Sequence, residues 1–151
     1  MATHRQEPNL GVLLFVSYRA LEQRAHDAVI AAGITDITPT QARIAARIAP
    51  HGSRVSDLAE QSRVTKQSAG FLVDQLEAAG YVERAIDPAD RRARLVQLTP
   101  RAHRVVTIAN TEVERVLAEW AAHVGTRRLQ QVYDVLLDLR EITDPWQQEL
   151  S

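Results

Sequence analysis

Apolar residues recur every three or four positions in six segments of the chain, a spacing that predicts six helices. The first helix ends before Gly33, a natural C-terminal cap, and carries the following apolar stripe: Leu10, Leu13, Leu14, Tyr18, Leu21, Ala25 and Ala28. The second begins at Thr38, where Pro39 fits the first helical position and Gln41 completes a capping box. It is expected to continue through Ile48 and to stop at residues 50–52.

A short helix over residues 55–62, a turn through Arg63 and a longer helix capped by Thr65 follow in the middle of the chain. Gly80 ends the longer helix, and the apolar period then changes from about 3.6 to 2. Residues 81–87 and 94–99 are therefore predicted to be two short strands, joined by an arginine-rich loop.

The last two helices start at Thr99-Pro100 and near Thr126, with Gly125 between them. The final helix places apolar residues along one stripe: Leu129, Val132, Tyr133, Leu136, Leu139 and Ile142. The predicted fold class is mainly α with a small β-hairpin, and the chain of 151 residues is most simply a single domain, 1–151.

Composition narrows the class of protein further. The chain is 45% hydrophobic and 25% charged, has no cysteine, and contains no apolar run of the roughly 20 residues that a membrane helix needs. The N-terminus lacks the features of a signal peptide, so a cytoplasmic protein without a membrane partner is expected. A net charge of −1 conceals an uneven distribution, because residues 81–104 hold six arginines against three acids, and residues 105–151 hold four against eight.

The order of a short helix, a tight turn, a second helix and a hairpin is the plan of a winged helix-turn-helix. In the second helix, Ala69, Leu72, Val73 and Leu76 form the predicted buried stripe. The opposite side and the N-terminal end then carry Lys66, Gln67, Ser68 and Phe71. Free N–H groups at a helix N-terminus bind phosphate, and glutamine can contact adenine through two hydrogen bonds.

The hairpin after this helix would reach the neighbouring minor groove or phosphate backbone if the helix entered a major groove. Arg92 is expected to contact the minor groove, with Asp90 holding its guanidinium extended. The remaining basic candidates for phosphate contact are Arg63, Arg84, Arg91 and Arg94.

Three segments within residues 55–99 resemble the MarR family of transcriptional regulators: "LAEQSRVTKQS", "LVDQLEAAGYVER" and "DPADRRARLVQLTPRA". The similarity in the order of elements extends over about residues 10–142, and the family's Asp-x-Arg wing motif matches Asp90 and Arg92. The resemblance implies a winged helix-turn-helix lobe at 38–99, with dimerisation helices at 10–32 and 101–145.

The resemblance also implies a homodimer that binds a pseudo-palindromic operator in double-stranded DNA, most often as a repressor. Its two recognition helices would lie about 34–36 Å apart. Many members are released from DNA by a small amphipathic or phenolic ligand, bound where the first, second and fifth helices meet. In this chain, the residues that could line such a site are Tyr18, His26 and Arg43.

Phe71 departs from the family pattern, because many relatives carry a polar or basic residue at this place. The phenylalanine could pack on thymine methyl groups, or the wing and DNA shape could carry more of the recognition. A rotation of the helix could also turn it inward. An exposed Phe71 further allows an alternative function, a winged-helix module that binds proteins and no specific DNA.

Catalysis has no support in the sequence, since it contains no glycine-rich phosphate loop, nucleophile elbow or HExxH motif. The histidines are dispersed, at positions 4, 26, 51, 103 and 123, so a zinc site would require the fold to gather them. We expect no cofactor and no metal. Trp120, Tyr133 and Trp146 are interpreted as core or dimer-interface residues.

Overall fold

The computed structural model describes residues 7–150 and has six helices and one two-stranded antiparallel sheet in that range. The elements are α1 (Leu10–Ala31), α2 (Pro39–Ala45), α3 (Val55–Ser62), α4 (Lys66–Ala78), β1 (Val82–Asp87), β2 (Asp90–Leu98), α5 (Pro100–Val124) and α6 (Thr126–Thr143). This architecture confirms the predicted, mainly helical fold with a hairpin wing. Within the described range, no helix has both the length and the apolar character that crossing a membrane requires.

Local capping signals set the helix starts as predicted. The Thr38 hydroxyl accepts a hydrogen bond from the Gln41 N–H, and the Gln41 side chain accepts one from the Thr38 N–H, which completes the capping box. Thr65 and Thr99 cap α4 and α5 in the same manner, through Ser68 N–H and Ala102 N–H. Each threonine satisfies an N–H group that the first helical turn would otherwise leave unpaired.

Helix α2 ends earlier than predicted, at Ala45. The amides of Arg47 and Ile48 bond to carbonyls only three residues back, so the chain tightens into turns before residue 50. Ile48 is still buried, at 7% exposure, and it packs in the same core that the helical pattern indicated. The apolar spacing thus predicted burial correctly and overestimated the length of the helix.

The hairpin also differs from the prediction. Strand β2 begins at Asp90 and pairs Arg94 with Ile86, so the arginines lie on the strand and the connection contains only residues 88–89. The register shifts between Ile86 and Asp87, so that Arg91 and Arg92 lie between the pairs Asp87–Asp90 and Ile86–Arg94 without a residue opposite them on β1. Arg94 is therefore paired in the sheet, whereas Arg91 and Arg92 lie in an irregular part of β2 next to the turn.

A third segment joins the base of the wing. Ser53 and Val96 exchange two backbone hydrogen bonds, of 3.0 and 2.8 Å, next to Gly52. Gly52 has φ +102°, and a Cβ there would lie 2.9 Å from the Gln97 side chain, so only glycine fits this close approach. The loop before α3 is thereby fixed to the wing.

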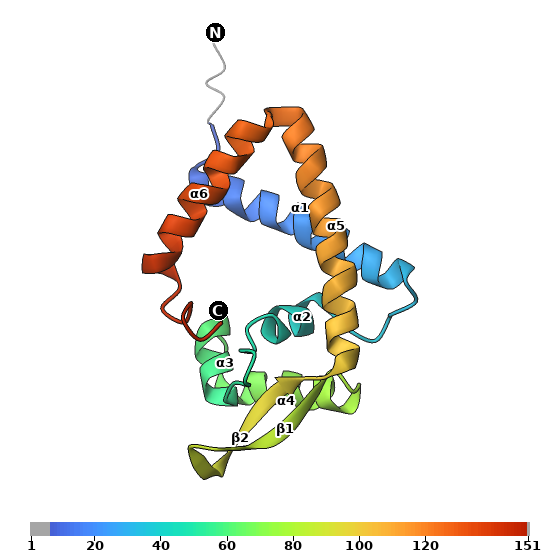
Figure 1. The fold of residues 1–151 in the computed structure, drawn as a ribbon, viewed down its shortest axis with the longest axis vertical. Coiled ribbons are helices and arrows are strands. Elements are labelled where there is room, and N and C mark those ends of the chain that lie inside the picture. Colours follow the sequence, from blue (N-terminus) through green and yellow to red (C-terminus); the bar gives the residue numbers. More distant parts are fainter. Residues whose placement is uncertain (1–6, 151) are drawn as a thin grey trace.

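We define the lobe as α2 to β2, and the helical frame as α1, α5 and α6. The lobe closes a core around the buried stripe of α4, with contributions from α1 and α5; its most buried members are Ile44, Leu58, Ala69, Val73, Leu76, Tyr81 and Val96. Figure 1 shows α4 and the hairpin at one end of the molecule, with α1 and α6 toward the other. The lobe therefore shares its core with α1 and α5 and presents α4 and the wing at one end.

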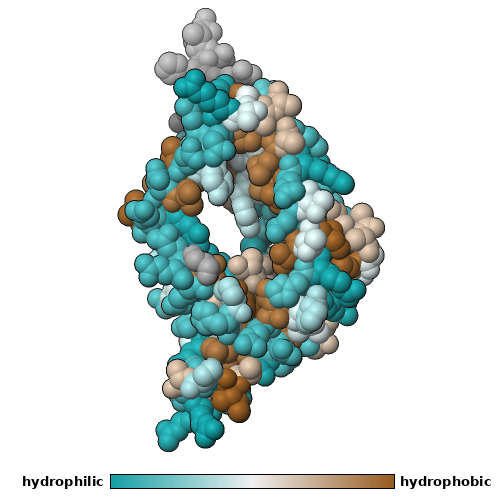
Figure 2. Space-filling model, viewed as in Figure 1, coloured by the Kyte–Doolittle hydropathy of each residue, from teal (hydrophilic) through white to brown (hydrophobic). Residues whose placement is uncertain are grey.

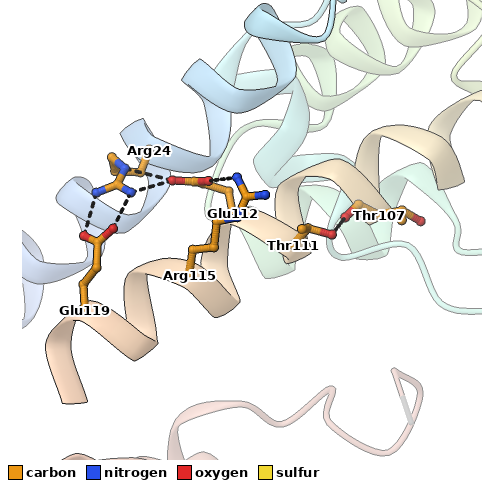
Figure 3. A network of polar contacts seen from close by, with 6 residues as sticks. All are labelled: Arg24, Thr107, Thr111, Glu112, Arg115 and Glu119. Carbon is orange, nitrogen blue, oxygen red and sulfur yellow. Dashed lines mark hydrogen bonds and ion pairs between the residues drawn. The ribbon is translucent and has the colours of Figure 1, made fainter. Parts of the chain in front are cut away.

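The frame is held together mainly by α1 and α5, which pack along each other. Arg24 of α1 lies between two carboxylates of α5, donating to Glu112 at 2.9 and 2.6 Å and to Glu119 at 3.0 Å (Figure 3). Helix α6 has no buried residue. In the space-filling view an opening separates α6 from the rest of the molecule (Figure 2).

Candidate nucleic-acid interface

The N-terminal part of α4 is exposed on the side opposite its buried stripe. Ala69, Val73 and Leu76 are at most 1% exposed, whereas Lys66, Gln67 and Ser68 all lie on the surface. Ser68 donates its backbone N–H to Thr65 and its hydroxyl oxygen accepts from the Thr65 hydroxyl at 2.8 Å. This turn presents amide donors and polar side chains together at a helix N-terminus, a favourable position for a phosphate group.

Phe71 is on the same exposed side, at 63% exposure, so the inward rotation considered from the sequence does not occur. A shallow depression surrounds it, lined by Thr40, Val64, Gln67, Ser68, Gly70, Phe71, Leu72 and Asp74. The exposed side of the helix is therefore partly apolar.

The turn into α4 and the wing bring five cations to this end of the molecule: Arg63, Lys66, Arg91, Arg92 and Arg94. No side-chain ion pair links any of them to a carboxylate within residues 7–150. Arg63 has the left-handed conformation, with φ 52°, that makes the turn between α3 and α4 tight. These cations could bind a polyanion without giving up an ion pair to a carboxylate of residues 7–150, although the Arg94 guanidinium donates to the carbonyls of Arg91 and Ala93.

Arg84, another predicted phosphate contact, is in a different situation. Its guanidinium is paired with Asp74 at 2.6 Å and with Glu77, both on α4. Contact with a phosphate would compete with these two carboxylates. In the structure Arg84 joins the hairpin to α4 and is shared between two acids, one of which, Asp74, lines the depression around Phe71.

Asp90 does not hold the Arg92 guanidinium as expected. Its carboxylate accepts from the Arg92 backbone N–H at 3.0 Å, and its other oxygen lies 3.9 Å from Arg54. The two side chains are two residues apart at the start of β2, where the backbone amide is the nearer donor. Asp90 thus fixes the turn, and the Arg92 side chain carries no ion pair.

Sequence reasoning missed the main support of the wing, which is an ion pair between Arg54 and Asp87. Arg54 donates two hydrogen bonds to one Asp87 oxygen, at 3.0 and 2.6 Å, and the other oxygen accepts from the Ala89 N–H. The Arg54 guanidinium, followed by the Ala89 amide, holds the pKa of the Asp87 carboxyl below its usual range. The Asp87-Pro88 pair at a turn was the available signal.

The predicted ligand residues divide into two groups. Tyr18 and Arg43 converge on Glu22, with the Tyr18 hydroxyl donating at 2.9 Å and Arg43 at 2.5 and 3.1 Å. They line a second shallow depression with Phe15 and Arg19. His26 lies further along α1 and does not line it.

Glu22 is therefore the acceptor at the centre of this cluster. The Arg43 hydrogen bond is the largest cause that lowers its pKa to about 2, with a smaller contribution from Tyr18 against the opposing effect of burial. Burial and the neighbouring Glu22 raise the pKa of the Tyr18 hydroxyl.

The remaining predicted positions add no further chemistry. Trp120 and Trp146 are half-buried and Tyr133 is 60% exposed, so the last of these is not a core residue of one chain. Among residues 7–150 no group of three or more histidine or acidic side chains could hold a metal ion. His4, which the sequence analysis included, lies outside the described residues.

Comparison with known proteins agrees with this geometry. A family model described as the MarR family matches residues 35–93, which hold α2 to α4 and most of the wing. YfiV, an uncharacterised HTH-type transcriptional regulator from Bacillus subtilis (strain 168), is 34% identical over 71 residues. That segment is 46% of this chain and 44% of YfiV, so the match spans less than half of the relative.

Solved structures extend the likeness over most of the chain. The transcriptional regulator Tm0710 from Thermotoga maritima has a TM-score of 0.63 at 25% identity, covering 89% of this chain and 93% of that one. NadR in complex with 4-hydroxyphenylacetate has a TM-score of 0.65 at 23% identity, covering 94% and 99%.

A mutant of MepR from S. aureus, bound to an oligodeoxyribonucleotide, has a TM-score of 0.57 at 17% identity, covering 89% and 98%. At their identities, NadR and MepR establish a shared fold and nothing finer. Together with the helix-turn-helix and wing described above, the family match shows that residues 35–93 form a winged helix-turn-helix of the MarR family of transcriptional regulators.

Proposed function

We propose that the chain is a cytoplasmic, non-enzymatic regulator that binds double-stranded DNA as a homodimer. The observation that carries this proposal is the set of five unpaired cations at the α4 and wing end of the molecule. Lys66, Gln67 and Ser68 would enter the major groove, and Arg92 would reach the minor groove from the wing. The DNA-bound MepR supports this use of the fold.

A second copy of the chain would cover the exposed apolar faces of the frame. Exposed residues on α1 include Leu10, Leu13, Phe15 and Val16, and those on α6 include Val132, Tyr133, Val135, Leu136, Leu137, Leu139 and Ile142. Ile142 alone is 81% exposed. Apolar surface on this scale is costly in water and is typical of an interface between subunits. Two-fold pairing would also place two α4 helices on a pseudo-palindromic operator.

A small anionic or phenolic ligand is the proposed signal that releases the DNA. Arg43 and Tyr18 could bind a carboxylate and a phenol, respectively, if the ligand displaced Glu22. NadR in complex with 4-hydroxyphenylacetate supports a ligand of this class. We propose that the protein acts as a repressor and that such a ligand relieves the repression.

Exposed Phe71 favours one rival function, a protein-binding module that has lost specific DNA recognition. Selection of bound sequences from random duplex DNA, followed by a mobility-shift titration at several salt concentrations, separates the two functions. The regulator is expected to enrich a two-fold symmetric sequence with half-sites one helical turn apart and to bind it less tightly as salt rises. Failure to bind any DNA at low salt would contradict the proposed regulator and favour the protein-binding module.

A further inference from the structure

Phe71 forms an apolar patch at the centre of a cationic surface. Beside it, Gly70 has no atom within 4 Å of the position a Cβ would occupy, so the backbone is open on that side. Val64 at 38% exposure and the methylene groups of Gln67 continue the depression toward the N-terminus of α4. The Phe71 side chain and the bare backbone at Gly70 therefore line one open depression, which could receive a small apolar group.

Charge around the patch indicates what that object belongs to. Asp74, an acid lining the depression, shares Arg84 with Glu77, which leaves one negative charge among these three side chains. Two cations at the N-terminal end of α4, Arg63 and Lys66, form no ion pair within residues 7–150 and outweigh it. The surroundings therefore favour a polyanion over an acidic or neutral protein segment. The apolar patch at Phe71 would then contact an apolar group that belongs to the polyanion.

The major groove of DNA exposes one such group, the C5-methyl of thymine. We propose that Phe71 packs against a pyrimidine C5-methyl group in each half-site, so that the protein discriminates methylated from unmethylated pyrimidines at that position. The inference rests on the proposed DNA binding and names the chemical group that α4 recognises. Gly70 serves the same contact, because a side chain there would stand between the helix backbone and the base.

Deoxyuridine provides the sharpest test, because it removes only the methyl group of thymine and preserves base pairing. Thymines of a selected operator would be replaced one position at a time, symmetrically in both half-sites, and the affinity measured for the wild-type protein and for Phe71→Ala. At one position, the wild type should lose about four-fold in affinity for each methyl group removed, and Phe71→Ala should lose nothing further. Phe71→Leu, which keeps an apolar side chain, should retain part of the sensitivity.

Cytosine at that position gives an independent comparison. An operator carrying 5-methylcytosine there should bind the wild type more tightly than the same operator with cytosine, and Phe71→Ala should not distinguish them. Phe71 is exposed, so its truncation should leave the core intact. Circular dichroism of each variant verifies that the protein is folded.

The outcomes separate this inference from the proposed function. Specific DNA binding without a deoxyuridine effect at any position would overturn the role of Phe71 and leave the regulator intact. Equal sensitivity in the wild type and Phe71→Ala would assign the methyl contact to another residue and would also overturn it. Absence of specific DNA binding altogether would defeat the proposed function itself.

Discussion

The helical frame and the lobe leave opposite kinds of surface uncovered. In the frame, Arg19, Arg24, Arg115 and Arg140 each meet a carboxylate, while large apolar side chains are exposed along α1 and α6. In the lobe, the apolar side chains close a core, while five cations form no ion pair with a carboxylate of residues 7–150: Arg63, Lys66, Arg91, Arg92 and Arg94. The frame thus requires another apolar surface, and the lobe an anion.

Two ion pairs join these parts and mark where a change in one could reach the other. Arg43 at the end of α2 binds Glu22 of α1, and Arg47 binds Asp144 beyond α6, at 2.6 and 3.2 Å. Arg47 also donates to Gln61 of α3, at 2.9 Å. The Arg47 side chain therefore connects α3, the helix that precedes α4, to the end of the frame.

The largest effect is expected from charging the apolar face of the frame. Leu136→Glu places a carboxylate where we propose that α6 meets the second copy, and burying an unpaired charge costs several kcal/mol. Dimer association should weaken by at least about 100-fold. Sedimentation equilibrium measures this change directly.

Gln131→Glu is the matched control, because it adds the same charge on an exposed polar position of the same helix. It should leave the dimer intact. If Leu136→Glu formed a dimer with wild-type affinity, α6 would not lie in the dimer interface. A different partner would then have to bury its apolar face.

Removal of a wing cation tests the other half of the comparison. Arg92→Ala should weaken operator binding by about ten-fold and flatten the dependence of log K on log salt by about one unit, since one phosphate-neutralising charge is lost. Fluorescence anisotropy at several salt concentrations gives both quantities. Arg115→Ala, in the frame and paired with Glu112, is the control and should leave the salt slope unchanged. An unchanged slope in Arg92→Ala would remove this residue from the interface.

The sequence predicts local features of this molecule well and distant pairs poorly. Thr38, Thr65 and Thr99 cap their helices as expected, because each cap depends on residues within one turn. The alternation after Gly80 located the hairpin but placed the arginines in a loop, since arginine at exposed strand positions resembles a loop in composition.

Pairs of residues far apart in the sequence could not be predicted from such local patterns. Arg54 and Asp87 are 33 residues apart, and Arg43 and Glu22 are 21 apart, so no local period relates them. For the same reason Asp90 was expected to bind the Arg92 side chain. The two residues are close in sequence, whereas the ion pair between Arg54 and Asp87 could not be recognised from the sequence. The helical period placed Phe71 on the exposed side of α4 but left open a rotation that would turn it inward, and the structure shows it exposed.

A smaller effect is expected at the support of the wing. Asp87→Asn keeps the size of the side chain and an oxygen that can accept from Ala89, but removes the charge paired with Arg54. The arginine-bearing strand should become less well positioned, and operator affinity should fall by about three- to five-fold, in the range of a partly exposed ion pair. Glu83→Gln, on the same hairpin and without an ion pair, should bind normally. Equal affinity of all three proteins would exclude this role for Asp87.

The smallest effect concerns acid stability and tests the junction between frame and lobe. Because Arg43 holds the pKa of Glu22 near 2, below the ordinary value of 4.5, the folded state binds fewer protons than the unfolded state between these values. The stability from this pair is fully present above about pH 4.5 and is lost as the pH falls toward 2. Wild type should therefore lose more thermal stability than Glu22→Gln between pH 5 and pH 3, by a few degrees in Tm at most (~2–5 °C).

Other carboxylates whose pKa values are lowered by ion pairs are present in both proteins, so the difference between the two curves isolates Glu22. Glu114→Gln, which removes an exposed carboxylate of α5 that has no ion pair, should follow the wild-type curve. Parallel curves for wild type and Glu22→Gln would show that Arg43 does not favour the ionised form of Glu22. Arg43 would then be available to a ligand carboxylate without competition, and the displacement step proposed for release of DNA would be unnecessary.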